Sequence, residues 1–220
     1  MFAKTRKVIV VLSSGVLLLA AAGCGGNADP VGPTGTSPTP TAPASSSPPT
    51  SSPSPTAKPT PTPVPASSKG PAKNWPVPKM PETAKSKSRE GIAAFTRYYF
   101  ELVDYTVLTY DTKPIKSVTE HSCQLCGEQL IDPAESNADQ GGWQVGGETD
   151  LQVSFTKLVE GSAFAGFTFH RTKTTIYLSE GEVQGEVPAT KTPVAGTLHL
   201  VYVPSGKWKV VDIEFIDAGK

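Results

Sequence analysis

The distribution of proline divides this chain of 220 residues into a part that cannot build a core and a part that can. Seventeen of the 22 prolines lie between Pro30 and Pro81, interleaved with Ser, Thr and Ala, and there is almost nothing to bury before Trp75. Such a segment cannot recover its ordering entropy through apolar burial, and proline favours extended polyproline II. We therefore predict a disordered stalk that, with Cys24 at its start, covers residues 24–81, and one globular domain over residues 82–220.

The stalk is most simply a spacer that holds the domain away from its point of attachment. Two further interpretations stay open, because Pro-x-x-Pro spacings can bind aromatic grooves and Ser/Thr-Pro runs can carry O-linked sugars. Charge also differs between the two parts, at +3 over residues 25–81 and −6 over residues 82–220. A mildly basic stalk suits anionic lipid or cell-wall polymer, whereas an acidic domain argues against nucleic acid as a partner.

Residues 1–23 have the parts of a secretory signal peptide: a positive start at Met1–Lys7, an apolar run over Val8–Ala22 and small residues at its end. This run is shorter than the roughly 20 apolar residues of a membrane-spanning helix. Cys24 follows at once, a placement that resembles the bacterial lipobox, although Ala21 stands where that pattern prefers Leu. The resemblance implies that the bond before Cys24 is cut and that its thiol carries a diacylglyceryl group with chains such as palmitate.

A protein of this kind is expected on the extracytoplasmic face of the cell membrane, held by its lipid anchor at Cys24. Two alternatives remain, a plain secreted protein with a free cysteine near its start and an uncleaved membrane anchor. A lone thiol at the end of the apolar run favours lipidation, because an unpaired cysteine is a liability in an oxidising compartment.

The first third of the domain is predicted to be helical. A serine cap at Ser86 or Ser88 begins a long helix near Arg89, and apolar side chains at 3–4-residue spacing continue it to about Tyr110. Two shorter helices follow, the first capped by Asp111-Thr112 and the second over Leu125–Asp139.

The remainder of the domain is rich in predicted strands. Alternating apolar residues and turn signals delimit four runs: Trp143–Leu158, Ala163–Leu178, Val194–Val203 and Lys207–Phe215. Helices followed by long antiparallel strands indicate an α+β domain, which we expect to be one curved sheet wrapped on the long helix.

Four sequence features together resemble a known family: Trp75-Pro76-Val77-Pro78 before the long helix, Gly91 to Tyr99 within it, Cys123-Gln124-Leu125-Cys126 after it, and Trp208 in the last strand. They are similar to actinobacterial lipoproteins catalogued as domain of unknown function 6318, over roughly Trp75 to Ile216. The order of elements resembles the cone-shaped, cystatin-like fold of the nuclear-transport-factor-2 superfamily. The family has no assigned activity, so the resemblance implies fold and compartment and no chemistry.

Cys123 and Cys126 are the cysteines that remain after Cys24. Outside the cytosol they most simply close a small structural disulfide. A thiol-redox site has the same spacing but normally follows a strand, and zinc needs two further ligands, of which only His121 is adjacent.

Histidines are few, and His199 is the one for which we considered a catalytic role. Members of the wider superfamily line their cone with an Asp–His pair, which implies an isomerase or dehydratase that uses His199 with Asp212 or Glu214 as the alternative function. The chain contains no nucleophile elbow, phosphate-binding Gly loop or metal-binding helix motif. We therefore predict a non-catalytic module that binds a small apolar ligand or another protein, without catalytic, cofactor-binding or metal-binding residues.

Overall fold

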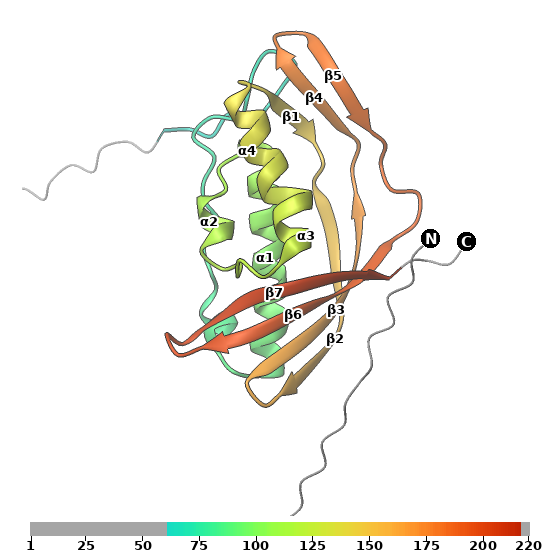
Figure 1. Ribbon diagram of the computed structural model, residues 1–220. Coiled ribbons are helices and arrows are strands. Elements are labelled where there is room, and N and C mark those ends of the chain that lie inside the picture. Colours follow the sequence, from blue (N-terminus) through green and yellow to red (C-terminus); the bar gives the residue numbers. More distant parts are fainter. Residues whose placement is uncertain (1–60, 217–220) are drawn as a thin grey trace, which may run out of the picture. The chain divides into compact units, whose positions relative to one another are not determined.

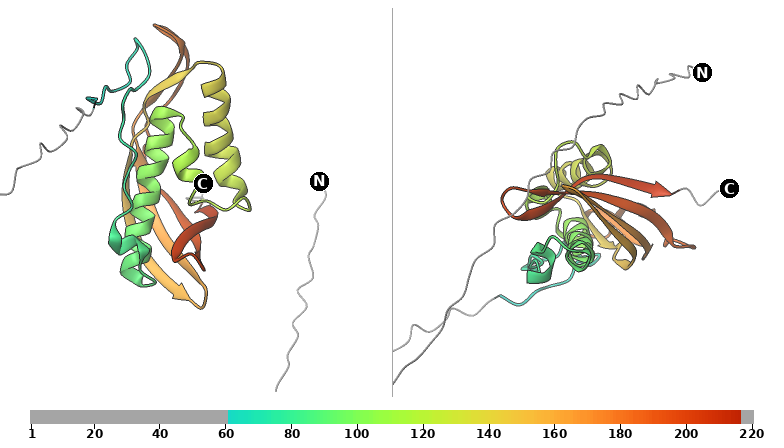
Figure 2. Two further views of the ribbon diagram at one scale, coloured as in Figure 1. Left: turned by 90° about the vertical axis from the view of Figure 1, so that its left-hand side faces the viewer. Right: turned by 90° about the horizontal axis from the view of Figure 1, so that it is seen from below.

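The computed structural model describes residues 61–216, so the predicted signal peptide, Cys24 and most of the predicted stalk lie outside the described residues. The elements follow the predicted order of helices first and strands after (Figure 1). In the left view of Figure 2 the helices lie in front of most of the strands, whereas the C-terminal hairpin, drawn in red, extends to the same side as the helices (Figure 1). Among residues 61–216, no helix combines the length and the apolar character needed to cross a membrane.

The long helix α1 runs over Arg89–Thr109, as its periodicity predicts. The Ser88 hydroxyl accepts a hydrogen bond from the backbone N–H of Gly91 at 3.0 Å, which satisfies a donor that the first helical turn leaves open. At the other end Tyr110 adopts the left-handed conformation, with φ of 57°, and its N–H bonds to the carbonyl of Thr106.

The other helical elements are short: η1 (Glu82–Lys85), α2 (Lys113–Lys116), α3 (Gln124–Cys126), η2 (Gly127–Ile131) and α4 (Asp132–Asp139). The last three follow one another directly and together confirm the helix predicted over Leu125–Asp139. The middle piece, η2, is π-helical rather than α-helical. We attribute this to Pro133, which has no N–H to donate to the carbonyl four residues earlier.

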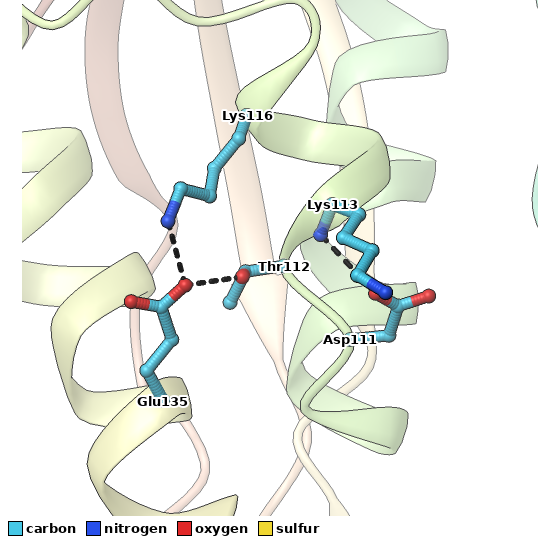
Figure 3. Close-up of polar contacts among 5 residues, drawn as sticks. All are labelled: Asp111, Thr112, Lys113, Lys116 and Glu135. Carbon is cyan, nitrogen blue, oxygen red and sulfur yellow. Dashed lines mark hydrogen bonds and ion pairs between the residues drawn. The ribbon is translucent and has the colours of Figure 1, made fainter.

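A carboxylate joins two of these short helices (Figure 3). Glu135 on α4 accepts one hydrogen bond from the Thr112 hydroxyl at 2.5 Å and another from the Lys116 ammonium at 2.7 Å, both on the same oxygen. These contacts, led by the one to Lys116, lower the pKa of Glu135. Asp111 accepts the backbone N–H of Lys113 and so orders the start of α2.

The strands form two antiparallel sheets instead of the single predicted sheet. The smaller sheet has the order β1-β4-β5 and the larger has the order β2-β3-β6-β7. Their bounds are β1 (Trp143–Gly146), β2 (Thr149–Val159), β3 (Ser162–Arg171), β4 (Thr174–Ser179), β5 (Glu182–Val187), β6 (Val194–Val203) and β7 (Lys207–Ile216).

Two interruptions, one between β1 and β2 and one between β3 and β4, divide the predicted strands and create the second sheet. Gly146 and Gly147 have φ angles of 80° and 91°, values that favour glycine, and they end β1 before β2 begins. Beside them, the hydroxyl of Thr172 accepts the N–H of Gly147 at 2.9 Å, between β3 and β4. The predicted runs Trp143–Leu158 and Ala163–Leu178 therefore each divide into two strands. Strand β5 was not predicted, because nearly all of its side chains are exposed and it has no buried face to produce an apolar pattern.

Residues 61–81 belong to the folded part, although the prediction assigned them to the disordered stalk. Val64 and Lys73 exchange two backbone hydrogen bonds, of 2.8 and 2.9 Å. The indole N–H of Trp143 donates to the carbonyl of Ser67 at 2.7 Å, and Ser68 accepts the N–H of Gly181 at 2.9 Å. These contacts use backbone groups rather than buried apolar side chains, so an argument from apolar content places the start of the domain too late, at residue 82.

The core lies between α1 and the larger sheet. Most of its largest fully buried side chains come from one face of the helix and from the inward positions of the strands, and Ile115 of α2 joins them: Ile92, Phe95, Tyr99, Leu102, Phe167, Leu198, Leu200, Trp208 and Val210. Next to the start of α1, the hairpin β6–β7 is hydrogen-bonded to the segment that leads into this helix. There the Tyr202 hydroxyl donates to the carbonyl of Lys85 and the Trp208 indole donates to that of Ser86, both at 3.0 Å.

Candidate functional site

The core does not fill all the space beneath the long helix. A cavity of about 310 Å³ lies between α1, the α3–η2 segment and the inward face of the larger sheet. Figure 1 shows the helices and strands that contribute its lining residues. Its lining is mainly apolar: Tyr99, Phe100, Val103, Val107, Leu125, Cys126, Gln129, Leu130, Phe169, Arg171, Val194, Ile213 and Phe215.

Three lining side chains carry polar groups, those of Tyr99, Gln129 and Arg171. The Tyr99 hydroxyl already has hydrogen-bond partners within the protein. The Tyr99 hydroxyl lies 3.2 Å from the Thr119 hydroxyl and 3.4 Å from the Cys126 sulfur. Burial raises the pKa of Tyr99 to about 12, so the phenol stays neutral and holds the helices together. Gln129 and Arg171 are left to contact a ligand.

Arg171 is the charged group of the cavity. It ends β3, and its Nε–H is buried without a hydrogen-bond partner among the described residues. Its guanidinium carbon lies 5.5 Å from the ring centroid of Phe169, in cation–π contact. Burial lowers the pKa of Arg171, although an arginine remains charged throughout the physiological range.

Asp104 on α1 is the nearby acid, but it is engaged elsewhere. Its two carboxylate oxygens each accept from both the N–H and the hydroxyl of Thr149, at 2.9 to 3.2 Å. Burial raises the pKa of Asp104, while the hydrogen bonds from Thr149 oppose that shift. Asp104 thus fixes the start of β2 against α1, and no ion pair among residues 61–216 includes it or Arg171.

One of the two paired cysteines, Cys126, lines the cavity. The sulfur atoms of Cys123 and Cys126 lie at disulfide distance, and the sulfur of Cys123 also accepts the N–H of Cys126. Both residues are buried, with 3% and 2% of their surface exposed. A redox site needs an accessible sulfur, so this burial favours the structural interpretation. His121, the adjacent candidate zinc ligand, is exposed.

We predict that this disulfide is inert in the native protein. Millimolar dithiothreitol followed by a maleimide should leave the native protein unlabelled, whereas both thiols should react once urea unfolds it. Replacement of both cysteines by alanine should lower the free energy of unfolding by about 2 kcal/mol, because the closed loop is short. Rapid labelling of the native protein would instead support the thiol-redox alternative.

The residues of the predicted isomerase or dehydratase site do come together, on the other face of the sheet. The Nε2 atom of His199 lies 3.6 Å from a carboxylate oxygen of Glu214, and Asp212 is the cross-strand neighbour of His199. One ligand atom from each of the three lies within 4.8 Å of the others, so together they can hold a metal ion. Glu214 is largely exposed.

Strand alternation shows that this cluster faces away from the cavity. His199 lies between Leu198 and Leu200, which are fully buried in the core, and so its side chain points outward, against Phe164. Glu214 lies between two cavity-lining residues, Ile213 and Phe215. The isomerase or dehydratase alternative required these groups inside the cone, and they do not line the cavity.

The prediction missed Arg171, although the sequence contains a signal for it. Phe167, Phe169 and Arg171 alternate along β3 and therefore share its inward face. A cation that continues an apolar strand face, at the point where the strand ends, indicates a charge at the border of a core. That signal was present, but it does not show that a cavity lies beside it.

The comparisons with known proteins give a family and no activity. Residues 61–214 match the sequence profile of a family described as "Family of unknown function (DUF6318)". No curated protein matches the chain. The crystal structure of the intermembrane space region of chloroplast protein ARC6 is similar over 59% of this chain and 96% of that one, with 8% sequence identity and a TM-score of 0.44, a likeness too distant to carry an argument. The family match spans most of the chain and confirms the family named from its sequence motifs; the chain belongs to the family of unknown function DUF6318.

Proposed function

We propose that this protein is a lipid-anchored, extracytoplasmic module whose domain binds a small, mainly apolar ligand in the cavity beneath α1. The observation that carries the proposal is the cavity itself. Its volume of about 310 Å³ lies at the lower end of the range typical of small-molecule sites, and apolar walls with a few polar groups are their usual lining.

The compartment is part of the proposal. A diacylated Cys24 would anchor the mature chain outside the cell, and the proline-rich segment would separate the domain from the bilayer. A buried cysteine pair at disulfide distance suits an oxidising compartment. The order of helices followed by antiparallel strands also agrees with the cone-shaped, cystatin-like architecture, which we include in the proposal.

The lining favours binding over catalysis. A general acid or base needs a pKa near the working pH and a position within reach of the substrate. The polar side chains of the cavity are a phenol with a pKa of about 12, a carboxamide and a guanidinium. None of these exchanges a proton readily near neutral pH, whereas each can orient a bound molecule.

Two valines on β6 give a matched test. Val194 lines the cavity, and Val201 lies an odd number of residues further along the strand, so that it points to the opposite face. We expect N-phenyl-1-naphthylamine, a neutral apolar fluorophore, to bind saturably to the parent domain. Val194→Trp should weaken this binding at least tenfold because the indole occupies the cavity, and Val201→Trp should leave it unchanged.

Fluorescence titration and circular dichroism are the measurements, the second to establish that each variant is folded. Absence of saturable binding to the parent protein would contradict the proposal. An equal loss in the two tryptophan variants would do the same, because only one of them reaches the cavity.

A further inference from the structure

A second cavity adjoins the first and has a different chemical character. It measures about 130 Å³ and shares Val107, Gln129, Leu130 and Arg171 with the larger one. The rest of its lining includes the polar side chains of Tyr110, Asn137 and Gln144. The Tyr110 hydroxyl donates to the carboxamide oxygen of Gln144 at 3.3 Å.

Arg171 therefore lies on the border between an apolar space and a polar one. On one side, Phe169 and Phe215 provide an aromatic wall, with ring centroids 6.4 Å apart. On the other side lie groups that can hydrogen-bond. A molecule that extends through both spaces would place its apolar part in the larger cavity and a polar part beside the guanidinium.

The acids around Arg171 are occupied by other partners. Asp104 has both oxygens bonded to Thr149, Glu148 accepts the Thr172 hydroxyl at 2.6 Å, and Glu186 pairs with Lys173 at 2.6 Å. No carboxylate of the described residues lies within 4.0 Å of the Arg171 nitrogens.

Asp104 attracts Arg171 only from beyond 4.0 Å, so this partly buried cation has no acid in direct contact among the described residues. Such a cation, with a buried N–H also left open, is costly for a folded protein. An acidic group from a ligand would supply an anion in direct contact with Arg171 and an acceptor for its open N–H. The guanidinium presents parallel N–H donors that match the two oxygens of a carboxylate.

We infer that the ligand is an amphiphile with a single acidic group, whose apolar part fills the larger cavity and whose acidic group binds Arg171. This inference rests on the proposed function and specifies its ligand class. Medium-chain carboxylic acids have the required chemistry, because they join one anion to an apolar body of limited volume. Arg171 here is a binding residue that selects the charged form of the ligand.

The test compares two ten-carbon molecules that differ in the head group. Decanoate and decanol compete with bound N-phenyl-1-naphthylamine at pH 8, where the acid is ionised. We expect decanoate to displace the fluorophore from the parent domain at a concentration at least tenfold lower than decanol. Equal potency of the acid and the alcohol would overturn the inference without affecting the proposed function, which requires only that the neutral fluorophore binds.

The variants assign the preference to one side chain. Arg171→Gln should abolish the advantage of decanoate over decanol, measured in that variant as the ratio of the two concentrations that displace the fluorophore. Arg171→Lys should keep part of the advantage, since lysine retains the charge but lacks the paired donors. Arg89→Gln, which removes an exposed arginine at the start of α1, is the control and should behave as the parent does.

Two results distinguish a failure of the inference about Arg171 from a failure of the proposed function. Saturable fluorophore binding with an unaltered decanoate preference in Arg171→Gln would refute the role of Arg171 and leave the cavity as a binding site. Failure of the neutral fluorophore to bind the parent protein would refute the proposed function, and the inference with it.

Discussion

Replacement of Cys24 by serine is expected to abolish lipidation of the protein completely. In the pattern that residues 21–24 resemble, the lipid is attached through a cysteine thiol, which a serine hydroxyl does not replace. A single acyl chain holds a protein to a bilayer only weakly, at ~0.8 kcal/mol per buried CH₂, whereas the two chains of a diacylglyceryl group give stable attachment. The effect should be all-or-none, with no incorporation of labelled palmitate into the variant. The intact mass should equal that of the unprocessed chain.

Ala21→Leu is the matched control for this experiment. It introduces the residue that the lipobox pattern prefers three positions before the cysteine, and so it should be lipidated and cleaved at least as well as the parent protein. The prediction of a lipid anchor would be wrong if both Cys24→Ser and the parent protein were cut before residue 24 and released into the medium. The protein would then be an ordinary secreted protein. An unlipidated, unprocessed parent would instead support the uncleaved anchor.

The long helix and the strand-rich remainder could be predicted because each has a strong local signal. Helix α1 combines a serine cap at Ser88 with an aromatic face of helical period, and its observed bounds, Arg89–Thr109, agree with the prediction. Strand β6 occupies Val194–Val203 as predicted, because its alternation ends at Pro204, just before a turn. Periodicity is reliable for elements of this kind because burial of one face determines it.

The division into two sheets could not be predicted by the same reasoning. Alternation continues across the interruption before β2, and the polar residues 170–175 before β4 include no glycine, proline, asparagine or aspartate to indicate a turn, so each pair of strands is predicted as one run. The backbone at Gly146 and Gly147 makes the difference, since a left-handed conformation there ends one strand and directs the chain into another sheet. Two consecutive glycines within an apparent strand were the available signal.

The sheet face that Asp212 and Glu214 share with His199 depends on a change of strand register that the sequence does not reveal. A β-bulge between His199 and Leu200 leaves Val211 without a partner in β6 and brings Asp212 opposite His199. The cavity is equally hidden, because an alternating pattern indicates which side chains point inward but not whether they fill the space between them. Packing of side chains from distant parts of the chain decides that, and Leu130, Phe169 and Phe215 come together only in the fold.

Trp208→Ala is expected to cause the largest loss of stability among single core substitutions in this domain. Trp208 is the largest of the fully buried side chains, with 0% of its surface exposed. Its ring packs edge-on against Tyr202, with centroids 4.9 Å apart. Truncation of a buried tryptophan costs about 3–5 kcal/mol through lost burial and the cavity left behind, and here the carbonyl of Ser86 also loses its indole donor.

A loss of this size is a large part of the roughly 5–15 kcal/mol that stabilises a typical domain. Urea unfolding of residues 61–216, followed by circular dichroism, measures it directly. Trp75→Ala is the matched control, since this tryptophan is 37% exposed and its removal should cost about 1 kcal/mol or less. Similar losses for the two variants would contradict the assigned role of Trp208. That role is to join the β6–β7 hairpin to the segment in front of α1, so that unfolding of this corner exposes the helix face on which the core and the cavity depend.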